Sequence, residues 1–430
     1  MDMILKGDIC YSKDPQNISV SENGYLVCEN GSVGGVFSQI PEKYKGLPVT
    51  DHTGCIIIPG LCDLHTHAPQ YSLRGLGMDM ELLDWLSTYT YPEESKYEKV
   101  DYAAKSYGEF ADALKSGATT RACVFATLHT PATVLLMEKL ERTGIVTYVG
   151  KVNMDRNCPS YVRSGSAAAA YRSTRAWIEQ TAGRFKRTSP ILTPRFIPTC
   201  SDGLMRLIKE LRTEYGLPVQ SHLSESLSEI AWVRELCPWA DCYARAYDEF
   251  GLFGGEGAPT VMAHCVFSEG VEEDLLRDKG VYVGHCPQSN INLSSGIAPV
   301  RRFMDKGIRV GLGSDVAGGC HLSILRAMGD AIQASKLYAK LMDPRSDPLG
   351  IKEAFYLGTV GGGSFFGKTG SFEAGYEFDA VVIDDGAIAS PNPLTPEERL
   401  ARVVYLSNES HILEKYVRGE QVYIKSAEGG

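Results

Sequence analysis

Two histidines that share one face of a predicted strand are the first residues suited to chemistry. They are His65 and His67, in the segment Pro59-Gly-Leu-Cys-Asp-Leu-His-Thr-His67, which follows an apolar run at residues 55–58. Side chains two residues apart on a strand project together, and two neutral imidazoles supply half of a first-row metal site. Pro69 ends the strand because proline cannot donate to a sheet ladder. We therefore expect a histidine pair at a strand's carboxyl end, although His-x-His alone is a weak motif.

Four more candidate residues stand at the ends of three later predicted strands: His222, Glu225, His264 and Asp315. Taken singly, each has an ordinary structural explanation. The two histidines could be core residues bonded to carbonyls, and Asp315 could be a helix N-cap. Glu225 could be a solvated helix residue, as we expect for Glu229. Together with the first pair they make four imidazoles and two carboxylates beyond four separate strands, which favours one shared site.

The position of one lysine favours a site with a single metal. A two-metal version of such a site needs a bridging carboxylate or a carbamylated lysine on the fourth predicted strand. That strand carries Arg195, whereas Lys151 lies on the third. A single metal would be held by three histidines and a carboxylate, and it would keep one water. Zinc suits that ligand set best, and Fe(II) is compatible with it.

The expected chemistry at such a site is hydrolysis. A metal that keeps one water lowers the pKa of that water to about 7, which makes a nucleophile at neutral pH. Glu225 could shuttle protons between the water and the substrate, and Asp315 could ligate the metal and accept a proton. His264 could stabilise developing charge. The predicted reaction is attack on a trigonal carbon of an amide, an amidine or a heteroaromatic C–NH2.

The rhythm of the chain from Pro59 onward predicts the scaffold that positions these residues. Apolar strand candidates alternate with helical patterns, as in proteins built on a parallel sheet. The eight strand candidates are residues 56–67, 118–125, 145–154, 191–198, 218–222, 260–266, 281–286 and 309–315. Eight is typical of an α/β fold with a closed (β/α)8 TIM-like barrel, which keeps its chemistry at the carboxyl ends of the strands. An open doubly wound sheet is the alternative, but no Gly-x-Gly-x-x-Gly follows a strand.

Both ends of the chain predict a second, smaller domain. Residues 3–58 form short strand-like runs, with Asn-Gly turn signals at Asn23 and Asn30. Strand-like runs return at residues 378–383, 412–417 and 421–424. We expect these strands to pair in a small β-sandwich domain. The predicted division is a β domain of residues 1–58 and 370–430, and a metal-dependent barrel of residues 59–369.

Composition argues against several other classes of protein. The formal net charge of −10 argues against binding to phosphate backbones, so no nucleic-acid partner is expected. No window approaches the roughly 18 apolar residues of a membrane span, and the N-terminus lacks a secretory pattern. The 12 cysteines include no Cys-x-x-Cys, which argues against a zinc ribbon. We expect a cytoplasmic protein with reduced thiols and no membrane partner.

The motifs resemble those of the amidohydrolase superfamily. The segment that ends at His67 is similar to its opening motif, and Ser221-His-Leu-Ser-Glu225, Ala263-His264 and Gly313-Ser-Asp315 are similar to its later motifs. Longer segments narrow the resemblance to the guanine deaminase family. These are His67-Ala-Pro-Gln-Tyr71, Leu83-Asp-Trp-Leu-Ser-Thr-Tyr-Thr90, Thr193-Pro-Arg-Phe-Ile-Pro-Thr-Cys-Ser201 and His285-Cys-Pro-Gln-Ser-Asn-Ile-Asn-Leu293. The resemblance covers nearly the whole chain.

The resemblance implies conversion of guanine and water to xanthine and ammonia, typically by a homodimer with one zinc ion per subunit. The zinc ligands that it implies are His65, His67, His222 and Asp315. It also implies that Glu225 is the proton shuttle and that Gln70, Arg195 and Phe196 bind the purine, while Trp85 could stack on the base. Ordinary alternatives are that Gln70 caps a turn, that Arg195 pairs with an acid and that Trp85 belongs to the core.

Two departures and two rival functions accompany this resemblance. Ser314 and Gln288 each stand where threonine is common, and the second could alter the loop over the pocket and thus the substrate range. One rival is a deaminase or chlorohydrolase of the same superfamily that acts on another aminopurine, an aminopyrimidine or a triazine. The other is a non-catalytic binding scaffold. A substrate panel would distinguish guanine deamination from the first rival, and metal analysis would distinguish a metal-dependent enzyme from the second.

Overall fold

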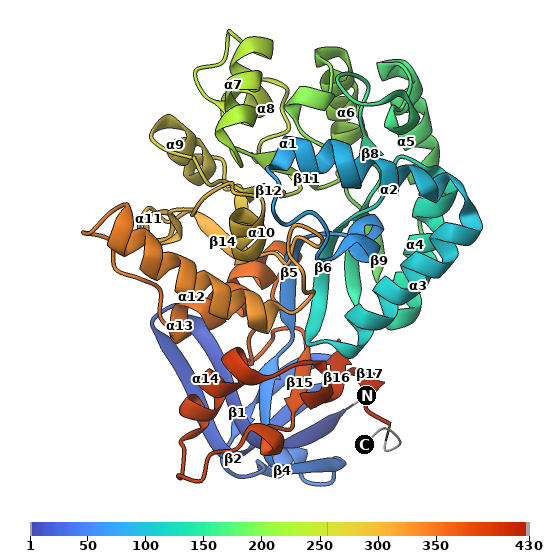
Figure 1. The fold of residues 1–430 in the computed structure, drawn as a ribbon. Helices are drawn as coiled ribbons and strands as arrows, with labels where there is room; N and C mark the ends of the chain where they lie inside the picture. The colour runs from blue at the N-terminus through green and yellow to red at the C-terminus, as the bar shows by residue number, and fades with distance from the viewer. Residues whose placement is uncertain (1, 256, 427–430) are drawn as a thin grey trace.

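The computed structural model describes residues 2–255 and 257–426. Parallel strands alternate with helices through the middle of the chain (Figure 1). One four-stranded sheet consists of β5 (Leu61–His67), β6 (Thr119–Phe125), β7 (Val146–Gly150) and β9 (Thr188–Pro190). A second consists of β11 (Val219–Leu223), β12 (Thr260–His264), β13 (Tyr282–His285) and β14 (Arg309–Leu312). The expected mixed α/β fold with parallel strands is confirmed.

Short pairings join the two sheets at their inner edges. β8 (Val152–Asn153) pairs in parallel with β10 (Thr193–Pro194), and Leu192 forms a parallel bridge with Val219. The predicted fourth strand is thus much shorter than expected, because a 3₁₀ turn at Ile197–Thr199 ends it. Proline at the second position of this turn, which cannot donate to a ladder, accounts for the early end.

Backbone hydrogen bonds join the first parallel strand to the segment after the last one. The amide of Asp315 donates to the carbonyl of His65 at 2.8 Å, and the amide of His67 donates to Val316 at 3.1 Å. Asp315 lies beyond β14, which ends at Leu312, so the predicted extension of this strand to residue 315 is wrong. Its φ of 45° turns the chain away from the extended conformation.

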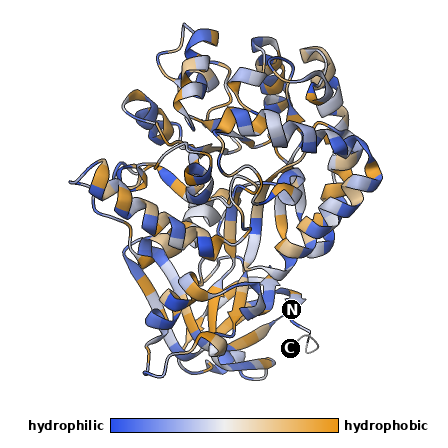
Figure 2. Cartoon of the chain, viewed as in Figure 1, coloured by the Kyte–Doolittle hydropathy of each residue, from blue (hydrophilic) through white to orange (hydrophobic). Residues whose placement is uncertain are grey.

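Helices cover the parallel strands on their outer side (Figure 1). The longer ones are α3 (Val100–Ser116), α4 (Thr130–Thr143), α5 (Ala167–Thr181), α6 (Asp202–Tyr215), α7 (Leu227–Leu236) and α12 (Ile324–Leu341). As expected, glycines in the left-handed conformation end some of them, Gly144 after α4 and Gly216 after α6. Figure 2 shows hydrophobic residues concentrated along the central strands. Among the described residues, no helix has both the length and the apolar character needed to cross a bilayer.

Strands from both chain ends form one seven-stranded sheet at the opposite end of the molecule from α7 (Figure 1). Its order is β17 (Glu420–Ile424), β16 (Ile412–Val417), β15 (Ala380–Ile383), β4 (Val49–Pro59), β1 (Met3–Asp14), β2 (Asn17–Glu29), β3 (Ser32–Phe37). The predicted pairing of the chain ends is confirmed. The turn at Asn30 lies between β2 and β3 as expected, but Asn23 lies within β2, where its amide donates to Asp8 beside a bulge.

The predicted continuous strand at residues 56–67 is wrong. The apolar run at residues 55–58 belongs to β4 of the seven-stranded sheet, whereas the histidines lie on β5. The chain passes from one sheet to the other at Gly60, whose amide donates to Asp379 at 3.0 Å. A Cβ at this glycine would lie 2.2 Å from Oγ1 of Thr120, so the close passage requires glycine.

Candidate metal centre and active site

His65 and His67 lie side by side at the carboxyl end of β5. They are 1% and 3% exposed, and their Nε2 atoms are 3.1 Å apart. The carboxylate of Asp63 accepts from the amide of His65 at 3.1 Å. It also accepts from the amide and the hydroxyl of Ser314, at 3.0 and 2.5 Å. Asp63 thereby fixes the histidine pair relative to the loop that carries Asp315, and the serine that departs from the family pattern serves as a donor.

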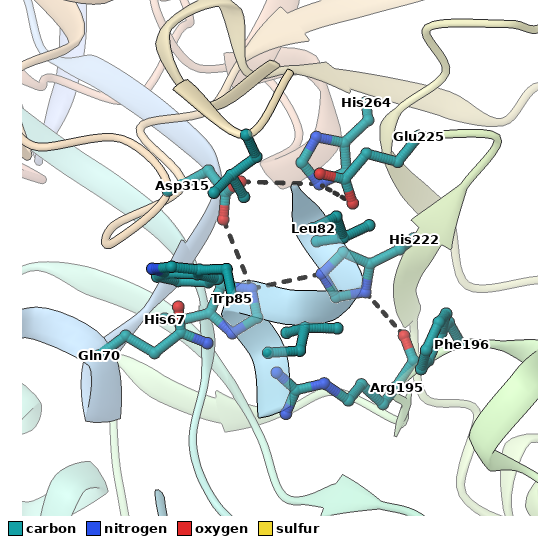
Figure 3. A pocket seen from close by; sticks show the side chains of 13 residues that line it. His67, Gln70, Leu82, Trp85, Arg195, Phe196, His222, Glu225, His264 and Asp315 are labelled. Atoms are coloured by element: carbon teal, nitrogen blue, oxygen red, sulfur yellow. Dashed lines mark hydrogen bonds and ion pairs between the residues drawn. The ribbon is translucent and has the colours of Figure 1, made fainter. Parts of the chain in front are cut away.

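Two further side chains bring ligand atoms to this pair. Nε2 of His222 lies 3.3 Å from Nε2 of His67. Oδ1 of Asp315 lies 3.2 Å from Nε2 of His65 and 3.5 Å from Nε2 of His67. Figure 3 shows His67, His222 and Asp315 converging from different elements. The structure thus brings together the four residues predicted as metal ligands.

This donor set fits a single cation. Ligand atoms about 2.1 Å from a tetrahedral metal lie about 3.4 Å from one another, close to the 3.1–3.5 Å found here. Burial lowers the pKa of His65, and it lowers the pKa of His67 and of His222 well below the usual range. The imidazoles are therefore neutral at physiological pH. Neutral nitrogens that face one another this closely are suited to share a positive ion.

The protonation of two ligands is set by their neighbours. Nδ1 of His222 lies 2.7 Å from the backbone carbonyl of Arg195, which only accepts, so Nδ1 carries the proton and Nε2 keeps its lone pair. Burial acts to raise the pKa of Asp315, but the nearby imidazoles of His65 and His264 and a hydrogen bond from Ser289 together lower this pKa to about 2. The site therefore presents an anionic oxygen together with neutral nitrogens, which is a suitable ligand set for zinc or Fe(II).

Glu225 and His264 stand beside this cluster. Burial and the nearby Asp315 raise the pKa of Glu225 well above its usual value, which favours the protonated form. Nε2 of His264 lies 3.4 Å from Oε2 of Glu225 and 3.6 Å from Oδ2 of Asp315. His264 also has a φ of 72°, a conformation that non-glycine residues adopt at a cost and that is common at functional sites. The imidazole of His264 thus lies between the carboxyl groups of Glu225 and Asp315.

Glu229 is not the solvated residue that we expected. It is fully buried, and its Oε2 accepts from the amide of Glu225 at 2.9 Å, while Oε1 accepts from Tyr243 at 2.8 Å. The residue also completes a capping box with Ser226 at the start of α7. The Ser-x-x-Glu spacing of residues 226–229 was the sequence signal for this role. Glu229 therefore fixes the backbone that carries Glu225.

The predicted substrate-binding residues line one cavity with these groups. The residues that line this cavity include Gln70, Trp85, Arg195, Phe196, His67, His222, Glu225, His264 and Asp315. Figure 3 shows Gln70 and Arg195 at one end of this pocket and Glu225 and His264 at the other. Trp85 is 2% exposed, and its Nε1 donates to the carbonyl of Leu76 at 2.9 Å. Trp85 is therefore both a packed residue and part of the wall.

A glutamate that the sequence analysis did not identify contacts both polar residues at the base end of the pocket. Oε1 of Glu94 accepts from Nε2 of Gln70 at 3.0 Å, and Oε2 accepts from Nη1 of Arg195 at 2.7 Å. Arg195 thus pairs with an acid, as its ordinary alternative proposed, and this acid lies behind the pocket wall. Glu94 lies on the short helix α2 (Tyr91–Ser95) next to another glutamate, and no spacing in the sequence distinguishes the two.

Two side chains of α10 (Pro287–Asn292) hold the loop that follows Asp315. Oε1 of Gln288 accepts from the amide of Cys320 at 2.6 Å, and Nδ2 of Asn292 donates to the carbonyl of Gly318 at 2.7 Å. Gly318 lines the cavity. The glutamine that departs from the family pattern is thus bonded to the loop over the pocket, as its position suggested.

Comparison with known proteins agrees with this arrangement. The sequence matches the amidohydrolase family over residues 56–422. It is 37% identical to guanine deaminase of Dictyostelium discoideum, over 87% of this chain and 84% of that protein. It is 35% identical to guanine deaminase of Homo sapiens, over 85% of this chain and 82% of that protein.

A solved structure agrees in fold as well as in sequence. The crystal structure of guanine deaminase from C. acetobutylicum with bound guanine in the active site has a TM-score of 0.95 and 44% sequence identity. The match covers 98% of this chain and all of that one. The resemblance to guanine deaminases that the motifs indicate is confirmed by these similarities. The chain belongs to the amidohydrolase family.

Proposed function

We propose that this chain is a metal-dependent hydrolase that converts guanine and water to xanthine and ammonia. The observation that carries the proposal is one cavity lined by the proposed ligands His67, His222 and Asp315 together with Glu225, and by Arg195 and Gln70 at its other end. His65 lies directly beside His67, with their Nε2 atoms 3.1 Å apart. The names of its relatives, and the guanine bound in the related crystal structure, support guanine as the substrate.

We propose that His65, His67, His222 and Asp315 hold one zinc ion, with Fe(II) as the alternative. When bound, such a metal lowers the pKa of a water molecule and makes it nucleophilic near neutral pH. The chain's own part is to keep three imidazoles neutral and one carboxylate ionised in a buried site. His264 also lies within reach of His65 and His222, so its imidazole stands beside the proposed metal position.

Glu225, Asp315 and His264 would move the protons. As the water oxygen bonds to the amino-bearing carbon, Glu225 gives its proton to the adjacent ring nitrogen, and Asp315 accepts a proton from the water. Glu225 then takes the proton of the new C–OH group and passes it to the amine, and ammonia leaves with the electrons of the C–N bond. The proton on Asp315 returns to Glu225 by way of His264, which lies within 3.6 Å of both.

Arg195 and Gln70 would orient the purine. The edge of guanine that carries O6 and N7 presents two acceptors, which a guanidinium can contact together. Gln70 offers a donor and an acceptor, and Phe196 and Trp85 offer apolar ring surface to a planar base. With these contacts at one end of the cavity, the amino-bearing carbon would face Glu225 at the other.

Several features of the scaffold belong to the same proposal. The parallel strands would close into a (β/α)8 barrel of residues 59–369, supported by the hydrogen bonds of Asp315 and His67 across its seam. Residues 1–58 and 370–430 would form the separate β domain, whose sandwich character stays a prediction. The homodimer also stays a prediction, which light scattering of the purified protein would test.

The test is ammonia release by purified, metal-loaded protein on a panel of purines, aminopyrimidines and triazines, with metal content measured on the same sample. We expect one metal per chain and turnover of guanine well above that of the other compounds. Activity on another member of the panel without activity on guanine would overturn the substrate and keep the reaction class. A protein that binds no metal and releases no ammonia would instead be a binding scaffold.

A further inference from the structure

We propose that Glu94 sets the selectivity of the pocket for a purine with an oxygen at C6, by fixing the two side chains that contact the base. This inference rests on the proposed function. Glu94 is not among the described residues that line the cavity, so it acts as a positioning residue through Arg195 and Gln70. All three residues are 2% exposed, so water does not compete for the contacts among them.

The two oxygens of Glu94 are divided between the two base-contacting residues. Oε1 lies 3.0 Å from Nε2 of Gln70, and Oε2 lies 2.7 Å from Nη1 of Arg195. Gln70 comes from the segment just after β5, and Arg195 comes from the segment just after β10. A single carboxylate therefore fixes the distance between the side chains of Gln70 and Arg195, which come from remote parts of the chain. That distance decides which edge of a base can contact both side chains.

Glu94 determines which way the amide of Gln70 faces. An ionised carboxylate only accepts, so it selects the NH2 end of the amide, while the amide of Ala317 donates to Oε1 of Gln70 at 3.2 Å. Turning the side chain by 180° would oppose two acceptors at Glu94 and two donors at Ala317. One N–H and one lone pair of the Gln70 amide thus remain to contact the base, and the positions of this donor and this acceptor are fixed.

Glu94 also fixes the guanidinium of Arg195 and balances its charge. Within residues 2–255 and 257–426, Glu94 is the only carboxylate that pairs with this guanidinium. The ring of Tyr91 lies 5.3 Å from its central carbon. With Nη1 held by Glu94, the N–H groups of Nε and Nη2 are left for a ligand. They suit the acceptors O6 and N7 of a 6-oxopurine, whereas adenine presents a donor at position 6.

The neighbouring Glu93 provides a matched control. It lies on the same helix and is 3% exposed, but its carboxylate contacts Ser72 at 2.7 Å and Lys96 at 2.6 Å, with Tyr102 as a third partner. None of these residues lines the cavity. Replacement of Glu93 therefore disturbs a buried carboxylate of α2 without touching Arg195 or Gln70.

The experiment compares Glu94→Gln with Glu93→Gln on guanine and on 2-aminopurine, which lacks the oxygen at C6. In Glu94→Gln one of the two contacts must be lost, because a primary amide cannot accept at both ends. We expect the ratio of kcat/KM for guanine to that for 2-aminopurine to fall about 10- to 100-fold in Glu94→Gln. The same ratio should stay within twofold of the parent in Glu93→Gln.

A binding measurement separates this inference from the proposed function. Hypoxanthine has O6 and N7 but no amino group at C2 to remove, and purine lacks the oxygen as well. We expect the metal-loaded parent to bind hypoxanthine more tightly than purine, and Glu94→Gln to lose at least 10-fold of that preference. If the parent binds neither compound and leaves guanine unchanged, the proposed function fails. If the parent is selective and Glu94→Gln keeps the selectivity, only the role of Glu94 is overturned.

A second variant covers the case in which Glu94→Gln does not fold. Glu94→Asp keeps the charge that balances Arg195, but its side chain is one methylene shorter and cannot reach both partners. We expect Glu94→Asp to fold, to bind metal at the parent level, and to lose three- to tenfold of the preference for guanine. Equal losses of activity on guanine and on 2-aminopurine would mean that Glu94 is merely structural, and would overturn the inference.

Discussion

Nδ1 of His264 lies 2.8 Å from Oδ1 of Asn290, and both side chains are 1% exposed. The amide oxygen accepts from Nδ1, so it fixes the imidazole with Nε2 directed at Glu225 and Asp315. Asn290 lies on α10, which also carries the residues that hold the loop after Asp315. One short helix therefore orients both an imidazole of the site and the loop above it.

Loss of this acceptor should lower turnover more than binding. We expect Asn290→Leu to reduce kcat for guanine about 10- to 100-fold, with KM within threefold of the parent, because His264 loses its orientation. Asn290→Asp, which keeps an acceptor oxygen, should recover part of the loss. Steady-state kinetics with metal analysis is the measurement. A normal kcat in Asn290→Leu would show that His264 is oriented without Asn290.

Replacement of the proposed proton shuttle should separate metal binding from chemistry. Glu225 is buried, and its carboxyl group is not one of the four proposed metal ligands. We expect Glu225→Gln to bind metal at the parent level and to lose turnover by at least about 100-fold, since an amide cannot deliver the proton. Retained ammonia release would remove Glu225 from the proposed mechanism.

Removal of the metal should lower stability as well as activity. A ligand that binds only the folded state adds about 4 kcal/mol of stability at a thousandfold excess over its Kd. We expect a chelator, or His67→Ala, to abolish ammonia release and to lower Tm by several degrees. His129→Ala is the control, because His129 is absent from the groups of potential ligands. Full activity after verified metal loss would contradict a metal-dependent reaction.

Lys151 should make stability depend on pH. Burial alone lowers the pKa of Lys151 to about 8, against an ordinary value of 10.5. Between these values the unfolded chain binds more protons than the folded chain, so stability should rise with pH from about 8 to 10.5 and be flat below. Lys151→Met should remove this slope and stabilise the fold at pH 7 by on the order of 3 kcal/mol. Urea unfolding at several pH values measures it.

A surface lysine provides the control for this prediction. Lys105 is exposed on α3, so its amine is solvated in both the folded and the unfolded chain. Lys105→Met should leave the pH slope of the parent intact. An unchanged slope in Lys151→Met would mean that the buried amine keeps its ordinary pKa through solvation or a partner that forms in solution.

The sequence by itself indicated the proposed metal ligands, and it predicted the mixed α/β fold with parallel strands. His65 and His67 are two residues apart on a strand, and His222, His264 and Asp315 each follow an apolar run. The spacing of the histidine pair and the position of the other residues after apolar runs are both local patterns, which can be read directly from the sequence. Parallel strands that alternate with helices place their carboxyl ends at one edge, so convergence of these residues could be expected.

Only the tertiary structure decided how these residues are held. No local sequence pattern identifies Glu94 or Asn290 as functional residues. An acid on a short helix and an amide after a proline are common in any sequence. Their importance comes from partners that lie far away in the chain, Arg195 for one and His264 for the other. The passage at Gly60 also depended on packing between distant segments, since Thr120 leaves no room for a Cβ there. Local periodicity carries no information about such contacts, which exist only once the strands have assembled.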